Sequence, residues 1–544
     1  MHLNLGVYEG RVERRLETWQ GSGFCRRLWS KDPTLWSSEP HQEIINRLGW
    51  LDLPEIMEGQ IKDLIAFAGE IRSEGINHVV LLGMGGASLA PEVFWRTFGN
   101  IQGYPALIVL DSTHPDTIRA IETRLNLART LFLVSSKSGT TTETISLFHY
   151  FWHRMEEVHQ MPGWHFVAIT DPGTPLEQLA LERGFRRVFQ APPDVGGRYS
   201  ALSVFGLLPA AMIGVDIGRI LERAKGMANA CVSSIPEQEN PCLRLGAALG
   251  ELAMAGRDKV TFIASIQLAS LLLWLEQLVA ESTGKDGKGI VPVADEPLSL
   301  PGVYGTDRLF VYLKLKGDED ARLEGQLAVL EAVGHPVAYI QLDEKADMGQ
   351  EFFRWEVAVA VAGAVLGINP FNQPDVELTK DITRRLMTQG EKEGRGDSAV
   401  KVEGEGLTHE LSSWLSNATP GDYVAIQAYL LPTSEITSLL QNLRMALRDR
   451  LRLATTIGYG PRFLHSTGQL HKGGPRKGLF LQLIDVPEKD IEVPSAGYTF
   501  GTLIHAQALG DFHALKQQGH RVLRVNLGSV VVQGLQRLLD TIQG

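Results

Sequence analysis

The chain has 544 residues, of which 44% are hydrophobic and 21% are charged, and its net charge is −11. This length exceeds what one hydrophobic core organises and predicts two to four domains. The acidic balance and the lack of a long basic run disfavour nucleic acid or an anionic membrane as a partner. Only Cys25, Cys231 and Cys242 occur, without a CxxC pair, which argues against a disulfide framework and a thiolate metal site.

The sequence shows no export signal or membrane-spanning run. Its first residues, MHLNLGVYEGRVERRLETWQ, lack an apolar core of signal-peptide length. The longest apolar runs, such as Val357 to Ile368, are too short to cross a bilayer. We therefore expect a cytoplasmic protein. An anionic small molecule would need a local positive site, which backbone N–H groups provide without net charge.

Short apolar runs alternate with segments of helical period along most of the chain. Near-continuous apolar strands separated by helices predict parallel sheets covered on both faces. The expected strands are 78–82, 106–110, 130–135, 165–170 and 187–190, then 259–264, 309–315 and 337–342, and finally 423–429, 478–484 and 522–527. The expected helices are 56–73, 142–158, 267–280, 320–333, 349–366, 435–451 and 502–517.

These elements fall into three α/β units. Residues 1–45 are mixed and Trp-rich and are expected to form an arm. Two three-layer αβα domains with parallel sheets are predicted at 46–215 and 216–390. A tract rich in Gly, Glu and Lys then predicts a linker at 391–407. The remaining residues, 408–544, predict a C-terminal α/β extension.

A glycine-rich turn follows the first expected strand, in HVVLLGMGGASLAP. Gly85 and Gly86 allow the backbone to approach a ligand closely, and the next helix presents free N–H groups to an anion. Ser88 follows one residue after Ala87. A plain tight turn between a strand and a helix explains the same residues, and the spacing is not that of GxGxxG.

A dense group of hydroxyl side chains follows the strand at 130–135. Seven of the ten residues from Ser135 to Thr144 are Ser or Thr. A phosphate, whose oxygens accept many hydrogen bonds, suits such a segment. A helix cap needs only one or two hydroxyls, so the cluster favours phosphate binding over capping. The candidate ligands are Ser136, Lys137, Ser138, Thr141 and Thr144.

Two positively charged residues that follow turn-forming segments are further candidates for the site. Arg198 follows Gly196 and Gly197 on a tight loop, where a guanidinium can stabilise a developing oxyanion. From this segment alone, an ordinary ion pair of a surface arginine is the favoured interpretation. Lys380 ends the segment FNQPDVELTK, and nothing in its local sequence distinguishes it from a surface lysine.

A carboxylate lies near the end of an apolar helix. Gln277 and Glu281 are four residues apart and share a helix face. Burial and the C-terminal end of a helix both disfavour a negative charge, so we expect the pKa of Glu281 to rise toward neutrality, as suits a general base. The alternative is that the side chain reaches solvent at the helix end.

The segments GMGGASLAP, SSKSGTTTET, VGGRYS, QLVAESTGK and INPFNQPDVELTK occur in this order. Together they resemble phosphoglucose isomerase (glucose-6-phosphate isomerase), over roughly residues 45–390. The whole chain is especially similar to the isomerase half of transaldolase/phosphoglucose isomerase fusions, which carries a C-terminal extension. The resemblance implies that the two domains at 46–215 and 216–390 are sugar isomerase domains. It also implies a sugar-phosphate substrate, no cofactor or metal, and a homo-oligomer.

The resemblance assigns roles to the candidate residues. Glu281 would move a proton between C1 and C2, Arg198 would stabilise the enediolate, and Gln277 would position the sugar. Lys380 would assist ring opening. The substrate-binding residues would be Gly85, Gly86, Ser88, Ser136, Lys137, Ser138, Thr141, Thr144 and Gly197.

Two departures from the family pattern affect this assignment. Ala87 replaces an expected serine, and Ser88 is a candidate substitute. The family's ring-opening histidine, supplied by the neighbouring subunit, has no counterpart at Val303 to Arg308.

The C-terminal unit contains FLHSTGQLHKGG, whose His465 and His471 are candidate replacements because imidazole titrates near neutral pH. A structured loop with hydrogen-bonded histidines is an equal alternative.

We therefore predict an aldose–ketose isomerase for glucose 6-phosphate and fructose 6-phosphate. An isomerase of relaxed specificity that also uses mannose 6-phosphate differs only in substrate. A non-catalytic sugar-phosphate-binding regulator would need the hydroxyl cluster but not Glu281, Arg198 and Lys380 together, and would usually carry a basic DNA-binding module. A dinucleotide enzyme is disfavoured by the glycine spacing.

Overall fold

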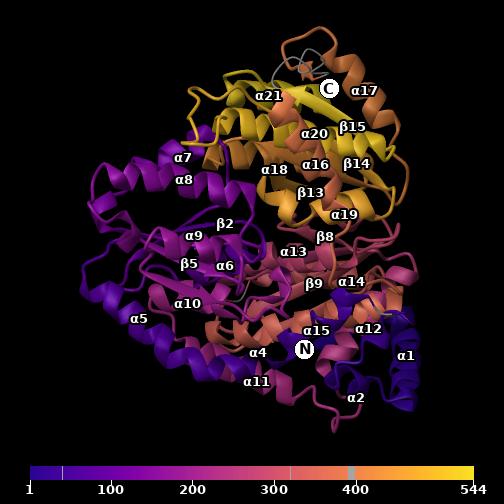
Figure 1. Ribbon diagram of the computed structural model, residues 1–544. Coiled ribbons are helices and arrows are strands. Elements are labelled where there is room, and N and C mark those ends of the chain that lie inside the picture. Colours follow the sequence, from indigo (N-terminus) through magenta and orange to yellow (C-terminus); the bar gives the residue numbers. More distant parts are fainter. Residues whose placement is uncertain (40, 319, 390–398) are drawn as a thin grey trace.

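The computed structural model describes residues 1–39, 41–318, 320–389 and 399–544. Within these residues the chain forms three five-stranded sheets with helices packed around them (Figure 1). Every strand pairing is parallel except that of the N-terminal strand β1. This confirms the predicted α/β architecture, with two parallel-sheet domains followed by a third α/β domain.

The first sheet has the order β3-β2-β4-β5-β6. Its central strands β2 and β4 are buried almost throughout, as their continuous apolar sequences require. The strands are β2 (His78–Gly83), β3 (Ala106–Leu110), β4 (Thr130–Ser135), β5 (Phe166–Thr170) and β6 (Arg187–Gln190). The helices are α5 (Ile61–Ser73), α6 (Gly86–Phe98), α7 (Pro115–Glu122), α8 (Thr142–Glu156), α9 (Pro175–Glu182) and α10 (Val204–Met212).

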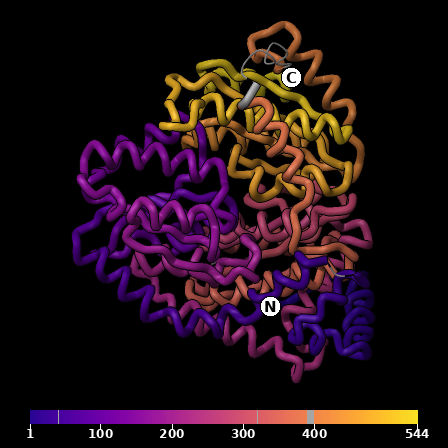
Figure 2. The backbone as a smooth tube through the Cα atoms, in the orientation of Figure 1, coloured from indigo at the N-terminus to yellow at the C-terminus, as the bar shows by residue number. Residues whose placement is uncertain are grey.

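The second sheet has the order β1-β10-β9-β7-β8. The predicted N-terminal arm supplies β1 (His2–Asn4), which runs antiparallel to β10, and its helices pack nearby (Figure 2). The other strands are β7 (Lys259–Ala264), β8 (Val291–Ala294), β9 (Arg308–Leu315) and β10 (Val337–Leu342). The helices are α1 (Glu9–Ser22), α2 (Phe24–Trp29), α3 (Gln42–Ile45), α4 (Leu53–Ile56), α11 (Ile217–Asn229), α12 (Pro241–Met254), α13 (Leu271–Thr283), α14 (Ala321–Ala332), α15 (Met348–Leu366) and α16 (Val376–Gln389).

One continuous hydrophobic cluster joins the first two domains and the arm. The predicted boundary at residue 215 falls between α10 and α11 and stays a prediction, because apolar side chains of both helices belong to this cluster. The two domains therefore share a core and are expected to hold a fixed geometry.

The third sheet has the order β11-β15-β14-β12-β13. Part of the predicted linker at 391–407 lies outside the described residues, and the described remainder includes β11, which pairs with β15. The strands are β11 (Val400–Lys401), β12 (Tyr423–Tyr429), β13 (Ala454–Tyr459), β14 (Gly478–Ile484) and β15 (Arg521–Asn526). The helices are α17 (Leu407–Ser416), α18 (Ser434–Leu451), α19 (Gly468–Gly473), α20 (Phe500–Gln517) and α21 (Val531–Gln543).

All three sheets share one strand order. Numbered within each domain from β2, β7 and β12, four strands follow the order 2-1-3-4, and the fifth strand lies beside strand 4 in every case. The fifth strand differs in origin, since it is β6 in the first sheet, the N-terminal β1 in the second and β11 in the third. The C-terminal extension thus repeats the topology of the two preceding domains.

Candidate active site

Glu281 lies in the last turn of α13, with Gln277 one turn before it. The Gln277 amide donates from Nε2 to Glu281 Oε2 at 3.0 Å, so the two side chains share a helix face as predicted. The Glu281 side chain is only 13% exposed, so the alternative in which this carboxylate reaches open solvent is wrong. The carboxylate is thereby oriented by a neighbour on its own helix.

Arg198 lies in the 3-10 helix η7 (Gly197–Tyr199) and is almost completely buried. Its Nη1 lies 3.0 Å from Oε1 of Glu281. The remaining donors are saturated: Nε donates to Ser282 Oγ at 2.8 Å, Nη1 to Gln373 Oε1 at 2.9 Å, and Nη2 to the carbonyls of Pro370 and Asn372 at 2.6 and 2.9 Å. The surface ion-pair alternative is therefore wrong, and three of the sequence motifs meet at one guanidinium.

The two glycines after β2 are required by close packing at this site. Gly85 has a φ of +57°, and a Cβ there would lie 2.8 Å from the His465 carbonyl and 2.9 Å from Gln277 Nε2. A Cβ on Gly86 would lie 2.0 Å from the Gly197 carbonyl. The two glycines therefore let the Arg198 loop, α13 and the third domain pack closely against this turn.

The hydroxyl segment forms the loop between β4 and α8. Ser136 Oγ and Thr141 Oγ1 lie 2.9 Å apart, and Ser138 Oγ and Thr140 Oγ1 lie 3.0 Å apart. Ser138 and Thr140 are exposed, so their hydroxyls are open to an anion at the start of the helix. Thr144 differs, because its Oγ1 is buried and has no hydrogen-bond partner among the described residues.

Lys137 and Ser88 are engaged by carboxylates rather than free. Lys137 forms an ion pair with Asp171, and burial lowers the pKa of its ammonium group. Ser88 is fully buried, and its Oγ lies within hydrogen-bonding distance of the Gly85 carbonyl at 3.1 Å and of Asp111 Oδ2 at 3.2 Å. The hydroxyl of Ser88 thus already has partners in the described structure.

His465 comes from the third domain and reaches the site. It ends the 3-10 helix η13 (Arg462–His465), and its carbonyl accepts a hydrogen bond from Gln277 Nε2 at 2.8 Å. Its ring Nε2 lies 2.9 Å from Oε1 of Glu143, a buried residue in the first turn of α8. Sequence reasoning missed Glu143, although an acidic side chain amid hydroxyls at a helix start is a recognisable signal.

Two basic side chains influence the pKa of Glu143. Burial opposes ionisation, but His465 and the more distant Lys380 act in the other direction, and the pKa of Glu143 is lower than usual. Lys380 lies on α16, half-exposed, with Nζ 2.6 Å from Glu377 Oε1. Lys380 therefore lies close enough to Glu143 to influence its pKa, and no contact between Lys380 and Glu281 is found within the described residues.

His471 does not reach the site. It lies on α19 within the third domain, with its ring among Tyr423, Phe463 and Phe480. Burial lowers the pKa of its imidazole well below the usual value. The alternative of a structured loop histidine describes His471, whereas His465 is placed beside the proposed catalytic residues.

The stretch from Val303 to Arg308 faces elsewhere. Arg308 is buried with Glu296, its Nη1 lying 2.9 Å from Oε2 of that residue, and the Arg448 guanidinium lies over the Tyr304 ring.

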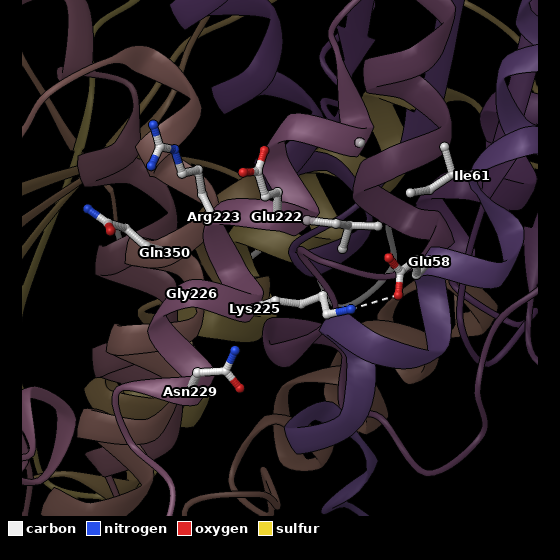
Figure 3. Close-up of a pocket in the computed structure, with 10 residues that line it drawn as sticks. Glu58, Ile61, Glu222, Arg223, Lys225, Gly226, Asn229 and Gln350 are labelled. Atoms are coloured by element: carbon white, nitrogen blue, oxygen red, sulfur yellow. Dashed lines mark hydrogen bonds and ion pairs between the residues drawn. The ribbon is translucent and has the colours of Figure 1, made fainter. Parts of the chain in front are cut away.

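A separate cavity of about 430 Å³ lies between η4 (Met57–Gln60) and α11, and an ion pair of 2.7 Å between Lys225 and Glu58 crosses it (Figure 3). None of the predicted site residues lines that cavity.

Comparisons with known proteins identify relatives of the chain. Residues 59–293 match the family model described as phosphoglucose isomerase. A glucose-6-phosphate isomerase of Rubrobacter xylanophilus is 31% identical over 389 residues, which cover 62% of this chain and 89% of that protein.

Solved structures share the fold. A hypothetical protein of Thermus thermophilus aligns with a TM-score of 0.60 and 25% identity over 71% of this chain and 99% of that one. A glucose-6-phosphate isomerase of Chlamydia trachomatis aligns with a TM-score of 0.53 and 19% identity, over 68% and 80% of the two chains. By its similarity to nearly the full length of a curated relative, the chain belongs to the glucose-6-phosphate isomerase family.

Proposed function

We propose that this protein interconverts glucose 6-phosphate and fructose 6-phosphate through an enediolate intermediate. The observation that carries the proposal is the contact between the Glu281 carboxylate and the Arg198 guanidinium, with Gln277 orienting the carboxylate. A base beside a fixed cation suits a reaction in which a proton leaves carbon while negative charge develops on oxygen. Family membership and the open hydroxyl loop support the substrate class.

The proposed chemistry assigns one proton transfer to Glu281 in each direction. With the open-chain aldose bound, the Glu281 carboxylate removes the proton from C2, and the C2–H electron pair forms the C1–C2 double bond. The C1 carbonyl π pair moves to its oxygen, where Arg198 stabilises the negative charge. Glu281 then returns the proton to C1, and the C2 hydroxyl proton moves to the C1 oxygen to leave the ketose.

Phosphate binding is assigned to the loop between β4 and α8. Ser136, Ser138 and Thr141 would donate to the phosphate oxygens together with the N–H groups at the start of α8. Ring opening is assigned to His465, which would protonate the ring oxygen while a base removes the anomeric hydroxyl proton. Lys380 would offset part of the negative charge that develops near the ring oxygen during ring opening. We also propose that the protein works in the cytoplasm, and a homo-oligomer remains a prediction.

A coupled assay tests the proposal directly. Fructose 6-phosphate is supplied and glucose 6-phosphate is detected through its dehydrogenase, for the parent and for Glu281→Gln, with and without a chelator. The parent is expected to turn over and the variant to lose activity while still binding the sugar phosphate. Binding by the parent without turnover would instead favour a non-catalytic sugar-phosphate-binding regulator.

A further inference from the structure

The third domain is attached to the first by polar contacts that are largely buried. Arg462 lies three residues before His465, and its Nε and Nη2 approach Asp111 Oδ2 and Glu92 Oε2, each at 2.7 Å. Gln507 of α20 accepts from Thr113 Oγ1 at 2.8 Å and donates to Glu143 Oε1 at 2.7 Å. Buried polar groups of the first domain thus find their partners in the third, which fixes the position of η13.

The third domain is attached to the second domain as well. The fully buried Arg444 donates from Nη2 to the Ala294 carbonyl and from Nη1 to the Asp295 carbonyl, both at 2.9 Å. Glu296 accepts a hydrogen bond from Thr455 Oγ1 at 2.8 Å in addition to its pairing with Arg308. Separating the domains would break these three hydrogen bonds between buried groups, which is unfavourable.

A short helix of the third domain inserts between the two segments that carry the proposed catalytic residues. Gln469 of α19 donates to the Gly284 carbonyl at 2.9 Å, just beyond the end of α13, and accepts from the Asp375 backbone N–H at 3.0 Å, just before α16. A Cβ on Gly284 would lie 2.3 Å from Leu470 Cα. The loop after Glu281 is therefore shaped to accept this helix at close range.

These contacts all lie within one chain. The third domain, which repeats the strand order of the other two, lies against the first and second domains in both backbone views (Figures 1 and 2). His465 meets Glu143 of the first domain and Gln277 of the second at hydrogen-bonding distance. Side chains from every domain of a single chain thus surround the proposed site.

We propose that each chain holds a complete isomerase site, in which its own third domain supplies His465 and no residue comes from a second subunit. The inference rests on the proposed function, and it specifies which chain provides the ring-opening group. The third domain then supplies the ring-opening histidine that the family resemblance assigns to a neighbouring subunit. Association between chains, where it occurs, is not needed for catalysis.

The test places two inactivating substitutions in different chains. Glu281→Gln and His465→Asn are co-expressed with different affinity tags, and sequential capture isolates particles that contain both variants. If sites are complete within a chain, each site in such particles keeps one inactivating substitution, and activity stays at the level of the two variants measured alone. If His465 acts across a subunit boundary, each pair of chains has one intact site, and about half of the parent activity returns.

Every outcome decides the question. Failure to capture mixed particles, with full activity of the parent at the same concentration, supports the proposal because single chains are then active. Restored activity in mixed particles overturns it, and so does a His465→Asn variant with parental activity on the cyclic sugar. His409→Ala, an exposed histidine of the third domain, is the matched control and is expected to behave as the parent. The parent and Glu281→Gln assayed alone test the proposed function separately.

Discussion

The Arg198 guanidinium lies 3.0 Å from the Glu281 carboxylate, while its other donors are bound to Ser282, Gln373 and two backbone carbonyls. The arginine is therefore held in place independently of any substrate. A cation fixed in this way needs little reorganisation when negative charge develops beside it, which is the most effective form of electrostatic stabilisation.

Glu281→Gln is expected to lower kcat by ~10²–10⁴-fold, because a general base typically contributes this much to the rate. The amide preserves shape and hydrogen bonding but cannot accept the proton from carbon. Exchange of solvent tritium into the C1 and C2 positions should vanish together with turnover. Binding of the sugar phosphate should persist in calorimetry, and a variant within a few-fold of the parent would remove Glu281 from the mechanism.

Arg198→Lys is expected to lower kcat more than it raises KM. Lysine keeps the charge but cannot reproduce the fork that contacts Glu281, Ser282 and the carbonyls of Pro370 and Asn372. Each buried carbonyl left without a donor costs about 1–3 kcal/mol of stability. Steady-state kinetics combined with thermal unfolding separates the two effects, and an unchanged kcat would contradict the assigned role.

Ser138→Ala combined with Thr141→Ala is expected to raise KM for the phosphorylated sugar and to change kcat less. A hydrogen bond to a charged oxygen contributes about 1.5–3 kcal/mol. Free glucose should be a very poor substrate for the parent. Ser438→Ala on α18, an exposed hydroxyl far along the chain, serves as the control. Equal use of glucose and glucose 6-phosphate would refute phosphate binding at this loop.

His465→Ala is expected to lower the rate of ring opening, whereas His471→Ala is expected to lower stability. The first should slow turnover of the cyclic sugar more than C1/C2 exchange on an open-chain analogue, because only ring opening uses the imidazole. The second removes a ring packed among three aromatic side chains and should cost about 1–3 kcal/mol of stability without a preference for either substrate. Equal losses on both substrates for His465→Ala would argue against its role in ring opening.

The free energy of unfolding is expected to decrease as the pH falls from 6.5 toward 4. Burial, with smaller contributions from nearby cations, lowers the pKa of His520 from 6.5 to about 4, and burial lowers that of His335 to about 4 as well. The unfolded chain therefore takes up these protons before the folded one does, and acid favours unfolding. His520→Gln should make the pH dependence shallower in denaturant titrations, whereas the exposed His409→Gln should leave it unchanged.

Long buried strands could be predicted well from the sequence. The expected strands at 106–110, 130–135, 423–429 and 478–484 coincide with β3, β4, β12 and β14, because buried parallel strands are continuous apolar runs. No sequence pattern indicated β1 and β11, which have three and two residues. Edge strands this short have no periodicity, and partners distant in sequence determine that they form.

The candidate site could be predicted only where its residues are close together in the sequence. Gln277 and Glu281 share a helix face by spacing alone, and the hydroxyl loop is contiguous in sequence. The contact between His465 and Glu143 joins residues that are 322 positions apart, and no sequence pattern distinguished His465 from His471. Burial separates them, since one ring lies in the core of a domain and the other lies at its interface.

The attachment of the third domain also determines when the site can form during synthesis. Arg462 and Asp111 are 351 residues apart, and the third sheet is incomplete until β15, which lies between β11 and β14, has left the ribosome. At translation rates of about 5–20 residues per second, Asp111, Glu92 and Glu143 of the first domain wait many seconds for their partners in the third domain. The nascent protein is therefore expected to stay inactive until nearly its last residues emerge, and a chain truncated before β15 to lack a functional site.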